Sequence, residues 1–495
     1  MRDKMEIKDL KAIYKQCDTF VVCSTQNQVV NYIPIVNMLE EKTEGDSKVR
    51  LLNITYENNE KARFSNSEWD QNLNSAFSEG IKNQNFIASK RENNKENFIN
   101  ICVPRIYNIS DYERAIKKET GKSNNIVWNL TGGQRSILLT VLKLIKKDLH
   151  QKEHTIIYME GNTNRFIIGR VENNDIIYRE LNGTYGCKDL NIKLVLGLAG
   201  FHVKDYSSSS LYGNKKEKTR EEEAIKYLYK YYSKKDEDTG KEEKWAVFRK
   251  KLLESQSKKL ANEQENEESS GKKGAQENKN SSESKKTKNN SKETEENGEN
   301  FNEAFEYFKN EIGEKEYKED DITVLKNVKD KNRNKLGYWL EMMLVHCLEV
   351  AIEKLEKQKK FKDYFLEIGH SIVLKGKEDK FCEFDVVLLT KTGQVVIFEC
   401  KSGVIDSDIA KARMYTAYAA GGVYGTPILI PAYLSYDETL VDAAGKTKKG
   451  KDLTVWGKMK ITRDAAFRAQ MDVWHLDEIQ EKLEDLFDEV ALEKK

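Results

Sequence analysis

The sequence has no long hydrophobic run, no secretion signal and no paired cysteines, and each absence excludes a class of protein. A membrane span needs about 18 consecutive apolar residues, and no stretch of the 495-residue chain approaches that length. Residues 1–16 lack the apolar segment and small-residue cleavage site of an exported precursor. The seven cysteines are an odd number without a Cys-x-x-Cys pair. We therefore expect a cytoplasmic protein with reduced thiols, no membrane contact, and neither a disulfide framework nor a structural zinc site.

The chain also lacks an excess of charge of one sign. Its 83 Lys and Arg residues are balanced by 82 Asp and Glu residues, so the formal net charge is +1. The overall charge does not indicate a nucleic-acid partner, and any such contact has to be local. At roughly 150 residues per domain, the length corresponds to about three domains.

One segment, 256–300, is almost free of apolar residues. Its apolar residues are Leu260, Ala261 and Ala275. Such a composition buries too little surface to repay the entropy lost on ordering, so we predict a disordered linker there. The linker separates an N-terminal part from a C-terminal part, which consists of a connecting segment at 301–329 and a globular domain over 330–495.

The N-terminal part alternates strand and helix patterns. Short apolar runs at 19–23, 49–54 and 125–129 predict buried strands, and the apolar spacing within 33–39 and 134–149 predicts amphipathic helices. Strands that alternate with helices indicate an α/β fold with a parallel, doubly wound sheet.

Three further runs, at 154–159, 165–171 and 175–181, are typical of hairpins at the edge of a sheet. They complete a predicted N-terminal domain over 1–187. The pattern that follows is mainly helical and predicts a small helical module over 188–255, for which a winged-helix fold is one option.

A paired-glycine turn with the sequence Asn-Leu-Thr-Gly-Gly-Gln-Arg lies at 129–135, between a predicted strand and a predicted helix. Glycines let the backbone approach a ligand closely, and the N–H groups at a helix N-terminus suit phosphate. Ligands of open α/β sheets bind at the carboxyl ends of strands, where we also expect the loop 24–31. The candidate ligand-binding residues are Thr25, Gln26, Asn27, Asn31, Thr131, Gly132, Gly133, Gln134 and Arg135. The alternative is an ordinary strand-to-helix turn without a ligand.

The turn at 129–135, together with the loop Ser-Thr-Gln-Asn at 24–27, resembles the signature of CARF domains. These domains are the sensors of cyclic oligoadenylates in type III CRISPR systems. The resemblance covers 15–185 and implies a Rossmann-like fold and a cyclic oligoadenylate as ligand. It also implies a homodimer that binds the nucleotide across a two-fold axis. Gln134 departs from the family, which often has threonine or serine at that position.

In the C-terminal part, two apolar strand patterns flank a turn at 391–393 and predict a β-hairpin over 382–401. Centring the turn places Asp385 directly opposite Glu399, with the Cβ atoms ~5 Å apart. Glu399 and Lys401 share one face of their strand because they are two residues apart.

Facing carboxylates repel one another unless a cation lies nearby. Oxygen ligands without a converging His or Cys favour Mg²⁺ or Mn²⁺ over Zn²⁺. Lys401, on the same face, can orient or deprotonate a water and stabilise charge that develops on a phosphate. The alternative is a cross-strand salt bridge on a solvated face.

A third carboxylate, Glu341, lies in a predicted helix whose buried stripe runs from Leu336 to Leu355. Its neighbours one turn away include Leu344 and Val345, so we expect it at the edge of the apolar face, where an acid needs a partner. The alternative is an exposed glutamate on the helix surface.

The series Glu341, Asp385 and Glu399-Cys400-Lys401 resembles the core of PD-(D/E)XK nucleases. The resemblance implies a restriction-endonuclease-like α/β domain in which Glu341, Asp385, Glu399 and Lys401 are catalytic. It also implies that Asp385, Glu399 and the Cys400 carbonyl bind Mn²⁺ or Mg²⁺. The proline that precedes the aspartate in the family is replaced by phenylalanine here.

A sensor fold joined to this core resembles the CRISPR-ancillary nucleases with an N-terminal CARF domain and a C-terminal PD-(D/E)XK domain. The resemblance implies a homodimer that is activated by cyclic tetra-adenylate and cuts single-stranded DNA, RNA or both. Two alternatives stay open: a restriction-type endonuclease that cuts duplex DNA without an activator, and a ligand-controlled transcription regulator with an inactive nuclease core. Degradation of the activator by the sensor domain is also left open.

Overall fold

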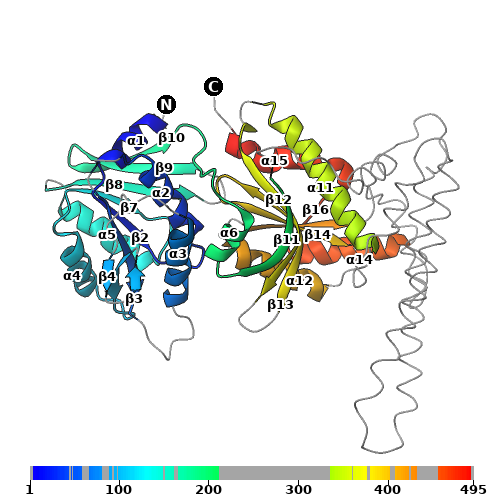
Figure 1. Ribbon diagram of the computed structural model, residues 1–495, viewed down its shortest axis with the longest axis horizontal. Coiled ribbons are helices and arrows are strands. Elements are labelled where there is room, and N and C mark those ends of the chain that lie inside the picture. The colour runs from blue at the N-terminus through cyan, green and yellow to red at the C-terminus, as the bar shows by residue number, and fades with distance from the viewer. Residues whose placement is uncertain are drawn as a thin grey trace, which may run out of the picture.

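The computed structural model describes residues 4–43, 46, 48–57, 66–80, 89–91, 94–96, 98–148, 151–160, 165–210, 335–358, 361–375, 380–401, 407–422, 425–431 and 455–491. Within them the chain forms two α/β units, each built around its own large sheet, which lie side by side (Figure 1). The predicted linker 256–300, the connecting segment 301–329 and most of the predicted helical module 188–255 lie outside the described residues. No helix in the described part of the chain has the length and apolar character that crossing a membrane requires.

The first unit is built on an eight-stranded sheet with the order β1-β10-β9-β8-β7-β2-β3-β6. Its strands are β1 (Lys4–Met5), β2 (Thr19–Cys23), β3 (Arg50–Tyr56), β6 (Ile99–Val103), β7 (Asn125–Asn129), β8 (Glu153–Glu160), β9 (Arg165–Glu172) and β10 (Asp175–Leu181). Neighbouring strands from β8 to β6 are parallel, whereas β9 pairs antiparallel with both β8 and β10. The predicted parallel α/β sheet with hairpin strands on one side is confirmed.

Helices cover both faces of this sheet. They are α1 (Ile7–Gln16), α2 (Val29–Glu40), α3 (Asn66–Gly80), α4 (Ile109–Thr120) and α5 (Arg135–Lys147), and a small separate hairpin joins β4 (Ser89–Arg91) to β5 (Asn94–Glu96). The predicted amphipathic helix after the glycine turn is α5, whose residues Ile137, Val141 and Ile145 are buried. They pack with β2, β3 and β7 in one core, while α1, α2 and α3 contribute to another.

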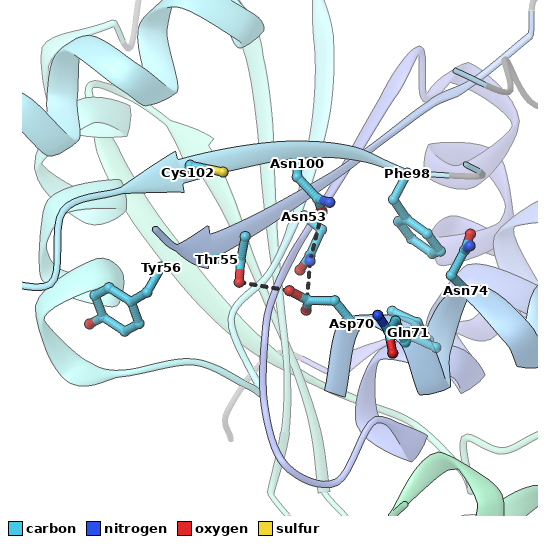
Figure 2. A pocket seen from close by; sticks show the side chains of 10 residues that line it. Asn53, Thr55, Tyr56, Asp70, Gln71, Asn74, Phe98, Asn100 and Cys102 are labelled. Carbon is cyan, nitrogen blue, oxygen red and sulfur yellow. Dashed lines mark hydrogen bonds between the residues drawn. The ribbon is translucent and has the colours of Figure 1, made fainter. Parts of the chain in front are cut away.

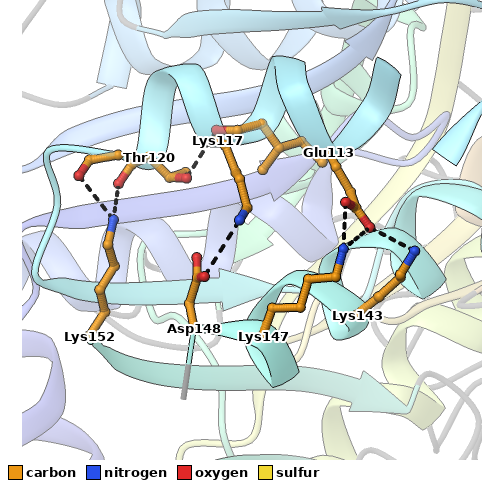
Figure 3. Close-up of polar contacts among 9 residues, drawn as sticks. Glu113, Lys117, Thr120, Lys143, Lys147, Asp148 and Lys152 are labelled. Carbon is orange, nitrogen blue, oxygen red and sulfur yellow. Dashed lines mark hydrogen bonds and ion pairs between the residues drawn. The ribbon is translucent and has the colours of Figure 1, made fainter. Parts of the chain in front are cut away.

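Ion pairs at the surface connect α4 to α5. Glu113 on α4 lies 2.9 Å from Lys143 and 2.7 Å from Lys147, and Lys117 lies 3.5 Å from Asp148, which follows α5 (Figure 3). Hydrogen bonds from Lys147 and Lys143 lower the pKa of the Glu113 carboxyl. The lysines of these pairs are exposed, so water screens the charges and the buried core holds the two helices together.

The second unit is built on a six-stranded sheet with the order β11-β12-β13-β14-β15-β16. Its strands are β11 (His202–Ser210), β12 (Phe365–Lys375), β13 (Lys380–Thr390), β14 (Val395–Lys401), β15 (Gly425–Pro431) and β16 (Asp472–Val473). Its helices are α11 (Lys335–Leu355), α12 (Ser407–Gly421), α14 (Val455–Arg468), η3 (Leu476–Glu478) and α15 (Ile479–Ala491). Helices α11 and α15 pack on one face of the sheet, and α12 and α14 pack against β15 on the other. The unit is mixed α/β, as predicted.

Strand β11 departs from the predicted order of domains. In the described part of the predicted helical module, the only helix is the short α6 (Ile192–Leu198). The chain then enters β11, which pairs antiparallel with β12 and forms the outermost strand of the second sheet (Figure 1). The prediction of a helical module is therefore wrong for 202–210. Val203 and Tyr206 are its only large apolar side chains, so pairing with β12, rather than its own periodicity, makes this segment a strand.

The two units share one hydrophobic core around α2. Every residue of α2 from Val29 to Leu39 except one is buried, because the helix packs between the first sheet and the hairpin β13–β14. At the hairpin turn, a Cβ added to Gly393 would stand 2.3 Å from the Val29 side chain. The Lys391 carbonyl in the same turn accepts a hydrogen bond of 2.8 Å from the Cys187 N–H. Helix α2 begins at Val29, so the predicted loop 24–31 is wrong for 29–31 and Asn31 belongs to the helix. The same helix touches the turn of the candidate catalytic hairpin.

Candidate active site and ligand-binding rim

The hairpin β13–β14, which we call the candidate catalytic hairpin, has the register that the sequence predicts. The ladder between β13 and β14 pairs Val386 with Phe398, and continuing this register places Asp385 opposite Glu399. The ladder itself ends at Val386. Beyond it, Oδ2 of Asp385 accepts a hydrogen bond of 2.7 Å from the backbone N–H of Cys400. The two strands therefore stop pairing where the predicted carboxylates stand.

Asp385 has an environment that disfavours its negative charge. Burial, followed by the charge of Glu399, raises the pKa of the Asp385 carboxyl to about 7, although Lys401 and Arg413 act in the opposite direction. A cation placed near both carboxylates would stabilise the charged form of Asp385.

Glu399 is held by two cations. It is 3% exposed, and its Oε1 lies 2.6 Å from Nζ of Lys401 and 3.0 Å from Nε of Arg413. Burial by itself lowers the pKa of Lys401, but the charges of Glu399 and Asp385 together raise it above its ordinary value. Lys401 is therefore a protonated amine in this arrangement.

Arg413 is a member of the site that the sequence analysis did not include among the candidate residues. Besides the pair with Glu399, its guanidinium donates a hydrogen bond of 3.2 Å to the carbonyl of Glu383 on β13. On α12 it stands three residues after Ala410 and four before Ala417, both of which are buried. Its position about one helical turn from both buried alanines is the sequence feature that could have identified Arg413 as part of the site.

Glu341 approaches Cys400 from the face of the sheet that α11 covers. Its helix, α11, packs on the face of the sheet that carries the Cys400 side chain. Its Oε2 accepts a hydrogen bond of 3.2 Å from the hydroxyl of Ser371 on β12. Burial, then the charges of Asp385 and Glu341, raise the pKa of the Cys400 thiol. Glu341 thus lies near enough to act on Cys400 and also bonds to Ser371.

The donor chemistry of the hairpin fits a hard divalent cation. In the described ranges, no three Asp, Glu, His or Cys side chains converge in a way that could hold a metal ion. Asp385 and Glu399 nevertheless lie close enough for their charges to interact, and the Cys400 N–H points at Asp385. Because the N–H and C=O of one strand residue point the same way, the Cys400 carbonyl is directed to that side too. Three oxygen donors of this kind suit Mg²⁺ or Mn²⁺.

In the first unit, the paired glycines bring two loops together at the carboxyl ends of β2 and β7. A Cβ on Gly133, whose φ is +94°, would stand 2.4 Å from Cβ of Cys23. A Cβ on Gly132 would stand 2.9 Å from the Cys23 carbonyl and 2.9 Å from the Thr25 side chain. Only glycine allows this approach. The rim, which we define as the loop 24–27 and the turn 131–135, is therefore one continuous surface.

Asn31 lies beneath the rim. It is fully buried, its Nδ2 donates a hydrogen bond of 2.9 Å to the Cys23 carbonyl, and its Oδ1 accepts one of 3.0 Å from Nδ2 of Asn129. In this position the side chain fastens α2 to the ends of β2 and β7, and so shapes the rim from below.

The exposed part of the rim is polar. Gln26, Gln134 and Arg135 are exposed, and Thr131 is half-buried. Gln134 is the N-cap residue of α5, and its Oε1 accepts a hydrogen bond of 2.6 Å from the Tyr56 hydroxyl. The Thr131 hydroxyl accepts one of 2.8 Å from the backbone of β8. The start of α5 therefore presents its backbone N–H groups beside exposed amide and guanidinium side chains.

Asn27 points to the second unit. Its Nδ2 donates a hydrogen bond of 2.8 Å to the carbonyl of Gly421, at the C-terminal end of α12. Its Oδ1 accepts one of 3.1 Å from the N–H of Val29, at the start of α2. The rim and the second unit are therefore in direct polar contact.

A polar cavity of about 210 Å³ opens beside the rim, lined by residues of α3, β3 and β6 (Figure 2). Asp70 on α3 accepts hydrogen bonds of 2.8 Å from Asn53 and 2.7 Å from Thr55. Burial raises the pKa of its carboxyl. Tyr56, which bonds to Gln134, also lines the cavity. The sequence analysis missed it because no sequence pattern joins these residues.

The chain matches solved structures of known proteins, but its sequence matches none of the known families. No model of a known protein family matches the chain, and no curated protein sequence matches it. The structure of Can2 from Sulfobacillus thermosulfidooxidans in complex with cyclic tetra-adenylate is 14% identical, covers 96% of this chain and 99% of its own, and has a TM-score of 0.50. Protein VC1899 from Vibrio cholerae is 12% identical, covers 96% of this chain and 98% of its own, and has a TM-score of 0.51.

A third structure, of a type III CRISPR defence DNA nuclease activated by cyclic oligoadenylate, is 10% identical with a TM-score of 0.38. The match covers 88% of this chain but 53% of that one. The first two matches extend over nearly the whole of both chains. The chain therefore has the fold of Can2 and VC1899.

Proposed function

We propose that the chain is a metal-dependent nuclease of type III CRISPR defence, activated by a cyclic oligoadenylate, that cuts single-stranded DNA, RNA or both in the cytoplasm. The observation that carries the proposal is the pair of facing acids, Asp385 and Glu399, beside the Lys401 amine where β13 and β14 stop pairing. The fold shared with the Can2 complex supports it.

Asp385, Glu399 and the Cys400 carbonyl would hold Mn²⁺ or Mg²⁺. When bound, such an ion would stabilise negative charge on the phosphate oxygens and activate a water for attack. Lys401 keeps its amine beside Glu399, where it orients the attacking water or stabilises the charge that develops on the phosphate. Glu341 acts from the other side of the sheet, next to Ser371, as a supporting acid.

The rim would bind the cyclic oligoadenylate, with cyclic tetra-adenylate as the expected form. Backbone N–H groups at Gly132, Gly133 and the start of α5 suit the phosphates of the ring. The remaining contacts would come from the side chains of Thr25, Gln26, Thr131, Gln134 and Arg135, with Asn31 supporting them from below. The side chain of Asn27 is bonded to Gly421 and Val29 and would hold the loop in place. A ring with two-fold symmetry is bound most simply across a two-fold axis, so we expect a homodimer.

The test is a cleavage assay of the purified chain on single-stranded DNA, single-stranded RNA and duplex DNA. Mn²⁺ is supplied with no nucleotide or with cyclic tri-, tetra- or hexa-adenylate. We expect cleavage of a single strand that needs both Mn²⁺ and a cyclic nucleotide and stops when a chelator is added. Equal cleavage of duplex DNA without any nucleotide would support a restriction-type enzyme instead. Intact substrates in every combination would overturn the proposal.

A further inference from the structure

Helix α12 touches both candidate sites. Its last residue, Gly421, accepts the hydrogen bond from Asn27 of the rim. Its residue Arg413 forms the ion pair of 3.0 Å with Glu399 in the catalytic hairpin. Positions 413 and 421 are about 12 Å apart along a helix axis. One rigid element therefore spans the distance between the two sites.

We propose that α12 relays the state of the rim to the catalytic hairpin, with Arg413 as a positioning residue that controls how readily Glu399 accepts a metal ion. The inference rests on the proposed function, since it requires a metal at the hairpin and a nucleotide at the rim.

The charges around Glu399 give Arg413 this control. The carboxylate is 3% exposed, and one of its oxygens, Oε1, forms ion pairs with both Lys401 and Arg413. A divalent ion that binds Glu399 comes close to the guanidinium, and like charges repel strongly where water is excluded. Lys401 belongs to β14 itself, whereas a separate helix brings Arg413. The distance from Arg413 to Glu399 can therefore change while Lys401 keeps its place beside Glu399.

The packing of α12 lets it move as one body. Its buried residues are small, namely Ala410, Ala417, Ala420 and Gly421. A Cβ on Gly421 would stand 2.7 Å from the side chain of Val395 on β14, so the end of the helix lies against the hairpin with no spare room. Close-packed elements shift as units rather than deform. A displacement at Gly421 is therefore carried along the helix to Arg413.

Asn27 is placed to start that displacement. It directly follows Thr25 and Gln26 of the rim. Its Oδ1 is tied to the N–H of Val29 while its Nδ2 is tied to Gly421. A nucleotide that rearranges the loop 24–27 must either carry Gly421 with it or break this hydrogen bond.

The test measures Mn²⁺ binding to the full chain by isothermal titration calorimetry, with and without cyclic tetra-adenylate. In the unaltered protein the nucleotide raises the affinity for Mn²⁺. In Arg413→Gln the affinity without nucleotide rises about tenfold, because one nearby positive charge is removed, and the nucleotide adds little more. Arg413→Lys keeps the charge and largely restores the nucleotide response. The matched control is Lys411→Gln, an exposed cation on the same helix, which leaves both affinities unchanged.

Asn27→Ala tests the other end of the relay. This variant still binds the nucleotide, but its affinity for Mn²⁺ no longer responds to it. Combined with Arg413→Gln, it behaves like Arg413→Gln alone, because Arg413 acts after Asn27.

Three results would overturn the relay: an unchanged Mn²⁺ affinity in Arg413→Gln, loss of nucleotide binding in Asn27→Ala, or a double variant that behaves like Asn27→Ala. If the unaltered protein binds no Mn²⁺ even with the nucleotide, the proposed function itself fails. If the unaltered protein responds and Arg413→Gln responds equally, only the relay fails.

Discussion

The catalytic hairpin and the rim reach their geometry by opposite routes. In the hairpin, Asp385, Glu399 and Lys401 lie close in sequence, and one turn and the two-residue period of a strand bring them together. In the rim, Gly133 meets Cys23 from a distant part of the chain, because β2 and β7 are neighbours in the sheet. The hairpin therefore depends on charged side chains, and the rim depends on how closely two backbones approach. Substitutions in the hairpin should therefore change cleavage, and substitutions in the rim should change nucleotide binding.

The largest effect is expected in the hairpin. Lys401→Ala removes the amine that lies 2.6 Å from Glu399, and cleavage should fall by about 10²–10³-fold, the usual contribution of one group that stabilises developing charge. Nucleotide binding at the rim should not change. Single-turnover cleavage and calorimetry of nucleotide binding measure the two properties. Lys411→Ala is the control, and a Lys401→Ala enzyme that keeps full activity would contradict the assignment.

The next effect is a pH dependence of stability that arises at Asp385 in the hairpin. Burial and the charge of Glu399 raise the pKa of Asp385 from 3.8 to about 7. Between these values the folded protein holds a proton that the unfolded chain has released, so the free energy of unfolding falls as the pH rises through this window.

Asp385→Asn removes this dependence. Relative to the unaltered protein, the variant should gain up to about 4 kcal/mol between pH 4 and pH 8, since one pKa unit corresponds to about 1.4 kcal/mol. Urea unfolding at the two pH values with a chelator present measures the gain. An equal difference in stability at both values would show that Asp385 keeps its ordinary pKa.

A smaller effect on stability, but a complete one on ligand binding, is expected at the rim. Gly133→Val places a Cβ where only 2.4 Å separates it from Cys23, at a φ of +94°. We expect a loss of about 1–3 kcal/mol in the free energy of unfolding and loss of nucleotide binding. Denaturant unfolding and calorimetry measure both. Gly197→Ala is the matched control, because nothing lies within 4 Å of its added Cβ. Undiminished nucleotide binding in Gly133→Val would count against the rim.

The smallest effect is expected away from both sites. Glu113→Gln weakens the ion pairs between α4 and α5 (Figure 3), and pairs with exposed lysines contribute less than about 1 kcal/mol. Denaturant unfolding should show a change of this size, and cleavage should be unaffected. A change in cleavage would mean that α4 and α5 take part in the coupling.

Local patterns predicted much of the molecule. The period of the apolar residues identified β2, β7 and α5, and the turn at 391–393 set the register that places Asp385 opposite Glu399. The same reasoning did not find Arg413 as a partner of Glu399. That pair needs α12 to lie across the hairpin, and the spacing within α12 says only which of its sides is buried.

The failures have one physical cause. The strand β11 was read as part of a helical module, because its backbone conformation is stabilised by hydrogen bonds from β12, far along the chain. Asn27 was expected at the ligand because of its loop, and the hydrogen bond from its amide to Gly421 of the other unit was not predicted. Neither partner is visible from the local sequence.

The sequence by itself determined the alternation of strands and helices, the glycine turn and the facing acids, because these follow from turn chemistry and from the periods of strand and helix. Only the tertiary structure decided that α2 lies between the two sheets and that α12 reaches from Asn27 to Glu399. Such contacts depend on how separate elements fill space together, and close packing is a property of the whole chain.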